Sequence, residues 1–273
     1  MAIKINDFTM NEYTDFEVYR RTGDGELDFR LTDLQNLTLN ATQDKTELKG
    51  KNGRIIGYKK QNKALSGEGT SGVISAGLMA VQTGGETVQG EHIIKKSEVR
   101  TVAGDTVITN AAAVGTAGSE IGIIRVLNDV GAVDVTYLQA TTADATHFSY
   151  DPTSKKITLP VDASNPVIPN GKTIEYAYNR KVEGTKITDP SDKYSQVREI
   201  WIHGFGTDAC DNEYYAAIYI PRADFSGEFS LGLGGDQTVH NFKFDAMADL
   251  CAKNGSSNLF ELIIYSDGTQ PNP

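Results

Sequence analysis

Short stretches typical of β-strands follow one another along most of this chain, and turn residues separate them. The chain has 27 Gly against 8 Pro, and Val, Ile, Thr and Tyr are plentiful in the stretches between the turns. Many short strands at this spacing are typical of a β-sandwich or barrel. We predict a mainly β fold in one elaborated domain over 1–273. The strands are expected at 97–102, 106–109, 121–127, 133–139, 148–150, 156–159, 173–178, 196–204, 214–220, 227–233, 238–244 and 259–265.

The N-terminal part predicts a long hairpin. Residues 30–42 alternate, with Leu37, Leu39 and Ala41 on one side and polar residues on the other, which indicates a half-buried strand. The charged stretch 45–57 contains Asn52-Gly53, a strong turn signal. Residues 58–66 are the predicted returning strand, which is polar on both faces and therefore needs a partner surface.

Two short helices are expected beside the strands. The first begins at Thr70 or Ser71 as its cap and ends near Thr83, with Gly84 and Gly85 closing it. Its apolar stripe at helical spacing consists of Val73, Ile74, Gly77, Leu78 and Val81. The second helix is expected over 245–253, ended by Asn254-Gly255.

Composition excludes several classes of function. The net charge is −10, from 26 basic and 36 acidic residues, and an acidic chain is a poor general binder of nucleic acid phosphates. The longest uncharged stretch, 69–85, is too short and too polar to span a bilayer. We expect Cys210 and Cys251 to be reduced, buried and inert, since two cysteines make no disulfide framework, and a bridge between them is the alternative. With no signal-like N-terminus, synthesis and folding in a cytosol are expected.

No catalytic motif stands out, and we expect no enzymatic activity, cofactor or metal. The segment Gly67–Gly72 matches GxGxxG, but the strand before it is polar and no alternation of strands and helices follows, so a flexible lead-in to the first helix is the preferred interpretation. A Gly-rich corner carries metal-ligating residue types in no zinc or calcium order, namely His203, Asp208, Cys210, Asp211 and Glu213. The four histidines are far apart in sequence, and none of them suggests a catalytic triad.

The distribution of charge is more informative. Between Gln43 and Lys63 lie seven cations and two acids, a net charge of +5, so the remaining residues carry −15. The cations are Lys45, Lys49, Lys51, Arg54, Lys59, Lys60 and Lys63. A basic hairpin on an acidic body is either a solvated loop or a contact between copies, in which complementary charges set the register. A heterologous contact of that kind propagates into rings or filaments.

The order of these parts resembles the major tail tube proteins of tailed bacteriophages. The resemblance rests on the alternating strand 37–42, the charged segment 48–54, the segment 66–72 and the small-residue helix 73–82 near the N-terminus. Towards the C-terminus it rests on 225–231, the turn 234–236, 239–246 and 259–265. The stretch 148–159 also looks like phage structural proteins. Overall the resemblance covers about 34–82 and 196–265.

The resemblance implies a tail-tube-like fold, a hexameric ring, stacking of rings through the long charged arm, and a lumen through which DNA passes. The seven cations would then form the contact between rings. A conduit should lack rows of cations on its wall, and the polar faces that suit it carry Asn36, Thr38, Asn40, Thr42, Ser226, Glu228 and Ser230. We expect an elaboration at about 88–159 that faces outward.

The implied partners are further copies of the chain and other tail proteins, namely terminator, tape measure and distal tail protein. DNA is only passing cargo, no membrane is involved, and the location is the virion tail after assembly in the bacterial host cytoplasm. The alternatives are the inner tube of a contractile injection particle, another virion part such as a decoration protein, and a secreted carbohydrate-binding β-sandwich. A decoration protein would not polymerise alone into hollow rods, and a carbohydrate binder would need exposed aromatics.

Overall fold

The computed structural model describes residues 7–21, 25–232, 234, 239–248 and 257–266, and these are mainly β, as predicted. Contacts within the chain divide it into two compact units, unit 1 (1–87 with 187–273) and unit 2 (88–186). None of the helices in the described ranges has the length and apolar character that a membrane crossing needs.

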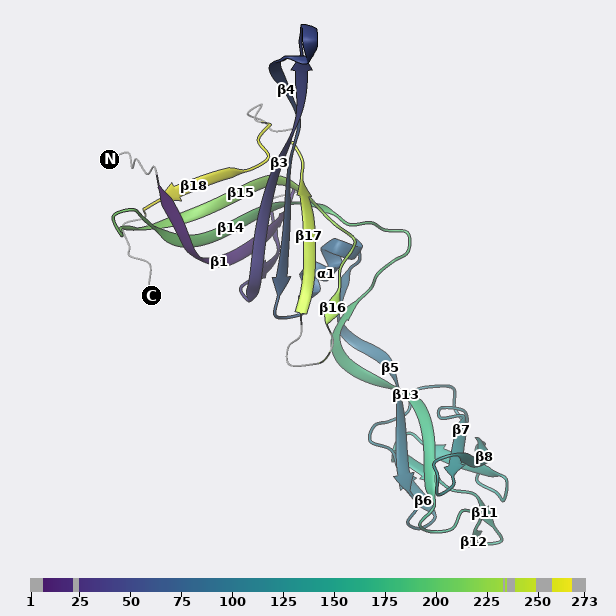
Figure 1. The fold of residues 1–273 in the computed structure, drawn as a ribbon. Coiled ribbons are helices and arrows are strands. Elements are labelled where there is room, and N and C mark those ends of the chain that lie inside the picture. The colour runs from purple at the N-terminus through teal and green to yellow at the C-terminus, as the bar shows by residue number, and fades with distance from the viewer. Residues whose placement is uncertain (1–6, 22–24, 233, 235–238, 249–256, 267–273) are drawn as a thin grey trace. The chain divides into compact units, whose positions relative to one another are not determined.

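Unit 1 is built on one sheet that curls into a half-barrel (Figure 1). Its strands run in the order β2-β1-β14-β15-β17-β4-β3, β16 pairs with β17, and β18 pairs with β15. The bounds are β1 Phe8–Arg20, β2 Leu27–Leu31, β3 Leu34–Lys49, β4 Ile55–Ser71, β14 Val197–Asp208, β15 Glu213–Phe225, β16 Leu231–Gly232, β17 Val239–Ala246 and β18 Glu261–Tyr265. A single 3₁₀ turn, η1 Lys51–Gly53, joins β3 to β4.

The core of unit 1 lies on one side of this sheet, against helix α1 (Ala76–Thr83). Alternate residues of each strand are buried there, as Phe16 and Val18 are on β1 and Phe242 and Phe244 on β17. Leu78 and Val81 of α1 complete the cluster. Because neighbouring side chains on a strand point to opposite faces, the residues between these core positions lie on the other side of the sheet.

Helix α1 ends as predicted but begins later. Its N-cap is Ser75, whose hydroxyl accepts a hydrogen bond from Leu78 N at 3.3 Å. The predicted cap positions Thr70 and Ser71 belong to β4, because β17 pairs with β4 as far as Ser71. Gly84 ends the helix with φ +67°, where a Cβ would lie 2.1 Å from Tyr194 O.

All of the GxGxxG segment except its last residue, Gly72, is part of strand β4, so the segment is not a flexible lead-in. Gly67 and Gly69 are buried and stand opposite Phe244 and Phe242 of β17. A Cβ at Gly67 would lie 2.1 Å from Phe244 Cζ, and one at Gly69 would lie 2.5 Å from Phe242 Cζ. The two phenyl rings therefore occupy the space that side chains on β4 would fill.

Other expectations also need correction. The predicted strand 227–233 is reduced to β16, and β1 was not predicted. Asp245 and Ala246 of the predicted second helix belong to β17, while 249–253 lie outside the described residues. Cys210 is free, as predicted, but exposed, since it lies in the turn between β14 and β15. Cys251 lies outside the described residues.

Unit 2 has its own sheet and core. The strands are β5 Thr87–Thr101, β6 Thr106–Ile108, β7 Ile123–Leu127, β8 Val133–Gln139, β9 His147–Asp151, β10 Lys156–Thr158 and β13 Thr173–Ile187, in the order β5-β13-β7-β8-β9-β10-β6, with a separate pair β11 Val161–Asp162 and β12 Asn165–Pro166. The elaboration expected at about 88–159 begins where unit 2 begins, and the unit continues to Lys186 because β13 completes the core. Its outward placement stays a prediction, as does its inclusion in one domain.

A buried carboxylate ties the strands of unit 2 together. Glu98 accepts hydrogen bonds from Tyr178 Oη at 2.5 Å, Tyr176 Oη at 3.0 Å and Asn110 N at 3.2 Å, and Arg100 lies 3.3 Å away. Burial by itself would raise the pKa of Glu98, but these hydrogen bonds outweigh it and hold the pKa below its ordinary value. The ionised carboxylate therefore fastens β5 to β13.

The packing of phenyl rings on glycines makes a prediction about stability. Gly67→Ala should lower the free energy of unfolding of unit 1 by about 1–3 kcal/mol, because the new methyl group overlaps the Phe244 ring. The measurement is urea unfolding followed by Trp201 fluorescence, since Trp201 is the only tryptophan and lies in unit 1. Gly57→Ala is the matched control, because the nearest atom to its Cβ is Leu48 Cδ1 at 3.9 Å. Equal stability of the two variants would contradict the packing argument.

Candidate functional site

The side of the sheet opposite the core is polar across β3, β4 and β17, and we call this surface the polar face. It carries Asn36, Thr38, Asn40, Thr42, Ser66, Glu68, Thr70, Ser226, Glu228, Ser230, Asn241, Lys243 and Asp245. Thr38 of β3 stands opposite Glu68 of β4, which stands opposite Lys243 of β17. Rows of small amides and hydroxyls thus run across three strands that come from both ends of the chain.

The segment 226–230 joins this surface next to β17. Ser226 N donates to Lys243 O at 2.9 Å, and Asn241 Nδ2 donates to Ser230 Oγ at 2.8 Å. Asn241 Oδ1 in turn accepts from Thr70 Oγ1 of β4 at 2.9 Å. The structure therefore brings together the two groups of residues that the sequence predicted for a lumen.

The predicted lumen residues are accessible from the solvent. Asn36, Thr38, Asn40, Thr42, Glu228 and Ser230 are exposed, and Ser226 is half-buried. The sequence reasoning did not include Glu68, Asn241, Lys243 and Asp245 in this group, although the alternation of 239–246 contained the signal. That the polar face lines a lumen stays a prediction.

The polar face carries little positive charge. Three carboxylates (Glu68, Glu228 and Asp245) and one ammonium (Lys243) give it a net charge of −2. The ammonium lies 3.9 Å from a carboxylate oxygen of Glu68, so its charge is partly neutralised. A surface of this kind offers DNA phosphates no row of cations to bind.

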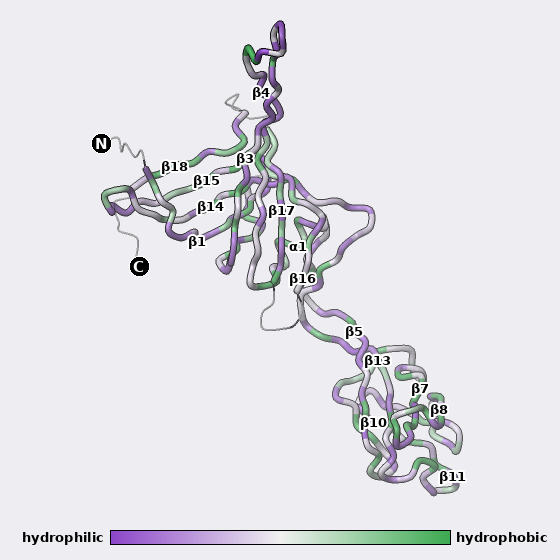
Figure 2. Tube along the Cα trace, viewed as in Figure 1, coloured by the Kyte–Doolittle hydropathy of each residue, from purple (hydrophilic) through white to green (hydrophobic). Residues whose placement is uncertain are grey.

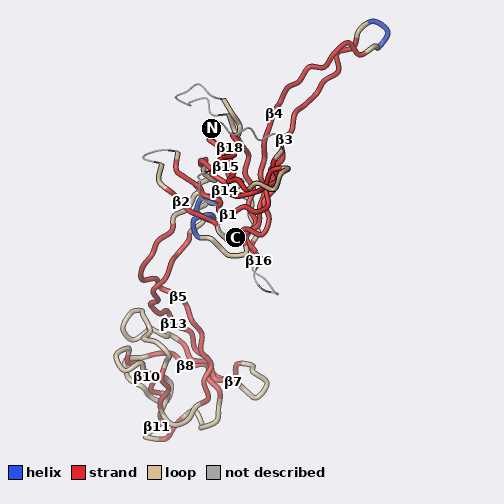
Figure 3. The backbone as a smooth tube through the Cα atoms, turned by 90° about the vertical axis from the view of Figure 1, so that its left-hand side faces the viewer, coloured by secondary structure: helices blue, strands red, loops and turns tan. Residues whose placement is uncertain are grey.

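The second feature is a two-stranded arm, residues 43–63 of β3, η1 and β4, which extends beyond the last pairing of β4 with β17 at Leu65 (Figure 3). Asn52 (φ +69°) and Gly53 (φ +74°) form its tight tip, as the Asn-Gly signal predicted. All seven predicted cations lie on this arm and are exposed, namely Lys45, Lys49, Lys51, Arg54, Lys59, Lys60 and Lys63. Their contact with another ring stays a prediction.

The arm combines its cations with apolar side chains. Lys45 and Lys60 stand directly opposite each other, an arrangement that destabilises a strand pair, and Lys45 Nζ lies 3.8 Å from the centre of the Tyr58 ring. The apolar side chains are Leu48, Ile55, Ile56 and Tyr58, each at least 46% exposed. Figure 2 shows a hydrophobic stretch near the tip of this otherwise hydrophilic hairpin. The sequence reasoning weighed only the charges.

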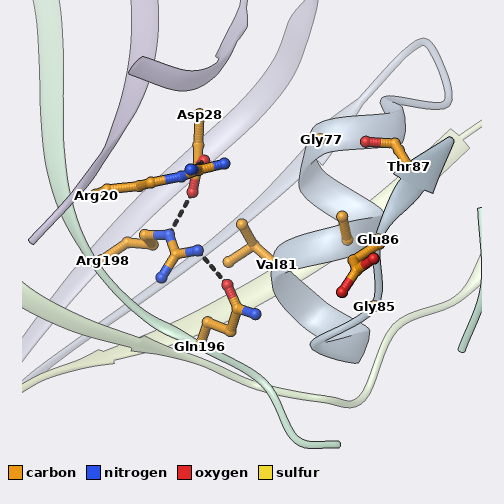
Figure 4. Close-up of a pocket in the computed structure, with 10 residues that line it drawn as sticks. Arg20, Asp28, Gly77, Val81, Gly85, Glu86, Thr87, Gln196 and Arg198 are labelled. Atoms are coloured by element: carbon orange, nitrogen blue, oxygen red, sulfur yellow. Dashed lines mark hydrogen bonds and ion pairs between the residues drawn. The ribbon is translucent and has the colours of Figure 1, made fainter. Parts of the chain in front are cut away.

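A cavity of about 570 Å³ opens beside α1 in unit 1 (Figure 4). Asp28 accepts hydrogen bonds there from Arg20 Nε at 2.6 Å and from Arg198 Nε. Arg198 also donates to Gln196 Oε1 and to the Val197 carbonyl oxygen. This network joins β1, β2 and β14, and the residues that line the cavity include no histidine or cysteine. Its geometry indicates a structural ion-pair network.

The structure does not gather the metal-ligating residue types of the Gly-rich corner, residues 203–213, into one cluster. Asp208 accepts hydrogen bonds from Cys210 N at 2.8 Å and Asn212 N at 2.9 Å and thereby shapes the turn between β14 and β15. His203 instead lies on β14 with its Nε2 3.6 Å from Glu17 of β1. In the part of the chain that the structure describes, no three His, Cys, Asp or Glu side chains gather as metal ligands.

One buried histidine supports the polar face from the core side. His240 of β17 is fully buried, and its Nε2 donates to Gln82 Oε1 at 2.8 Å, since Gln82 Nε2 itself donates to Asn241 O. The ring packs edge-on against Phe229, next to the exposed Glu228. Burial lowers the pKa of His240, and its Nδ1 has no hydrogen-bond partner among the described residues.

A comparison with protein families decides the identity of the chain. The model of the YomU/Tube protein family matches residues 9–261. The chain belongs to this family. The match covers nearly the whole chain, including both strands of the arm and the strands of the polar face, and it confirms the resemblance to phage tail tube proteins. No curated protein matches the chain.

Membership of the family has two consequences. It identifies the chain as a structural protein of the phage tail tube, and it implies a component of the virion tail. The matched range 9–261 also includes unit 2, residues 88–186.

The buried His240 predicts a pH dependence of stability. Because its pKa is below the ordinary value in the folded protein, the unfolded chain binds the extra proton first as the pH falls below about 6.5. His240 therefore contributes stability above that pH, and the contribution is lost as the pH falls through the folded pKa. The loss is at most about 1.4 kcal/mol for each pH unit.

The measurement is urea unfolding followed by Trp201 fluorescence at pH 7.5 and pH 5.5. The native chain should lose more stability between these values than His240→Gln, which keeps a polar side chain but does not titrate. His92→Gln is the control, because His92 lies in unit 2. An identical pH dependence in native chain and His240→Gln would show that His240 contributes nothing.

Proposed function

We propose that this chain assembles into stacked hexameric rings that form the phage tail tube, and that DNA leaves the virion through their lumen. The observation that carries the proposal is the polar face, because its amides, hydroxyls and net charge of −2 suit a wall past which phosphates must slide without binding. The opposite side of β3, β4 and β17 packs on the hydrophobic core of unit 1, so among the two sides of these strands only the polar face is available for this role.

The backbone of the polar face supports closure by neighbouring copies. The strands β3, β4, β17 and β16 form a patch with β3 at one margin. At the other margin, β17 pairs with β16 at Val239 and His240 and with β15 at Phe244–Ala246. Among the described strands β3 pairs only with β4, which leaves one of its edges open, and residues 226–230 beside β16 form no strand. Unpaired edges are sites where another chain adds a strand. In a ring, β3 of one copy would pair with the 226–232 segment of the next.

The proposed partners follow from this architecture. The main partner is the chain itself, within and between rings, and the arm makes the contact between rings. Terminator, tape measure and distal tail protein would meet the ends and the lumen of the tube. Assembly would take place in the host cytoplasm, with DNA as passing cargo and without a cofactor or catalytic step.

Electron microscopy of negatively stained protein at high concentration tests the assembly. The native chain should form hollow rods. Lys49→Glu/Lys51→Glu/Arg54→Glu should reduce rod formation at least about tenfold, because complementary charges set the register of such contacts, and should leave the urea unfolding of the monomer unchanged. Lys95→Glu/Lys96→Glu/Lys156→Glu in unit 2 makes the same change of charge as a control. Normal rods from the arm variant would show that the arm does not make the contact between rings. Absence of rods from every chain, the native one included, would contradict the proposed assembly.

The lumen is tested by adding cations to the polar face. In virions, Thr38→Lys/Asn40→Lys should slow DNA release at least about tenfold while tails of normal length still form, because the new ammonium groups bind phosphates. The measurement is DNA release after receptor addition, followed with an intercalating dye. Thr38→Gln/Asn40→Gln is the control for side-chain size. Release at the native rate from the lysine variant would place the polar face away from the DNA.

A further inference from the structure

The side of the unit 1 sheet that carries the polar face continues over β1, β14, β15 and β18, and there its side chains are of a different chemical kind. Across β1, β14, β15 and β18 the side chains opposite the core are mostly aromatic and acidic, and we call this surface, with Arg30 of β2, the aromatic face. It consists of Asp15, Glu17, Tyr19, Arg30, Glu199, Trp201, His203, Phe205, Tyr215, Tyr219, Glu261, Ile263 and Tyr265. Each of these side chains is half-buried or exposed, so the surface is open to a partner.

The rings of this face are held in place by their neighbours. Trp201 stacks on Tyr219 of the next strand with ring centroids 4.4 Å apart, and it lies parallel to His203 within 7°. Trp201 Nε1 donates to Glu199 Oε1 at 2.9 Å. Tyr215 and Tyr265 stack at 5.7 Å. Rigid, half-exposed tryptophan and tyrosine side chains are typical of the energetic centres of protein interfaces.

The face is also acidic. Four carboxylates (Asp15, Glu17, Glu199 and Glu261) stand against one guanidinium, which gives a net charge of −3. The guanidinium of Arg30 contacts Asp15 at 2.6 Å and Glu17 at 3.6 Å. Glu199 and Glu261 have no cation among the ion pairs of the described residues. The surface therefore attracts a partner that is basic and partly apolar.

The arm has this complementary chemistry. It carries a net charge of +5, and its tip exposes Leu48, with Ile55 at 47% and Ile56 at 73% exposure. Its directly opposed Lys45 and Lys60 repel each other in the free chain, and carboxylates from outside would relieve that repulsion. Cations placed over tryptophan and tyrosine rings gain a further attraction.

We propose that the aromatic face is the docking surface for the arm of a second copy of this chain. The isoleucines of the tip pack on the Trp201–Tyr219 stack, and the arm cations meet Glu199 and Glu261. This inference rests on the self-assembly proposed above and adds the receiving surface. Because donor and receiver are different surfaces, the contact is heterologous and repeats from copy to copy.

Trp201 provides a direct test, since it is the only tryptophan of the chain. On assembly of the native protein its emission should shift to the blue, and quenching by acrylamide should fall at least about twofold as the ring loses contact with water. Rods that form with unchanged emission and quenching would overturn the docking surface while the tube assembly stands. Absence of rods would overturn both.

Reciprocal charge reversal tests the pairing of the two surfaces. Glu199→Lys/Glu261→Lys should reduce rod formation as the arm variant Lys49→Glu/Lys51→Glu/Arg54→Glu does, and the chain with both sets of substitutions should regain at least part of it. Asp129→Lys/Asp134→Lys in unit 2 makes the same change of charge as a control and should not restore the arm variant. Trp201 fluorescence during urea unfolding checks that each chain folds. Normal rods from the face variant, or no recovery in a folded combined variant, would overturn the proposal.

Discussion

The packing of Phe242 and Phe244 on Gly67 and Gly69 determines most of what unit 1 presents to its surroundings. The rings fill the space over two glycines, so β17 and β4 come together in one register and with one side inward. A slip of one residue would turn every side chain to the other face. The polar face exists because this contact holds its alternate residues outward.

The sheet of unit 1 then carries two surfaces on the side away from its core. Over β3, β4 and β17 the side chains are small amides, hydroxyls and carboxylates, and over β1, β14, β15 and β18 they are aromatic and acidic. A wall for passing DNA needs the first kind, because weak contact with phosphates lets the cargo move. A contact between proteins needs the second, because rigid rings supply interface energy.

The charged residues are also distributed unevenly, both between the two units and among the surfaces of unit 1. Unit 2 carries ten cations against eleven acids, so it is nearly neutral, and the acidity lies in unit 1. Within unit 1 the arm has a net charge of +5, while the polar face and the aromatic face are both acidic. One chain therefore carries surfaces of both signs of charge, as the proposed contact between copies requires.

Local patterns in the sequence were sufficient for the fold class, the Asn52-Gly53 tip of the arm, the end of α1 at Gly84 and the exposed cations, because each depends on neighbours within a few residues. The tertiary structure decided the rest. It placed Gly67 and Gly69 on a strand, brought 226–230 beside β17, and assembled the aromatic face from five strands. β1 escaped prediction because its register shifts at Met10/Glu12 and Tyr13/Asp15 interrupt the alternation. Alternation tells which residues share a face of one strand, but the strands that lie beside it depend on pairing between distant segments.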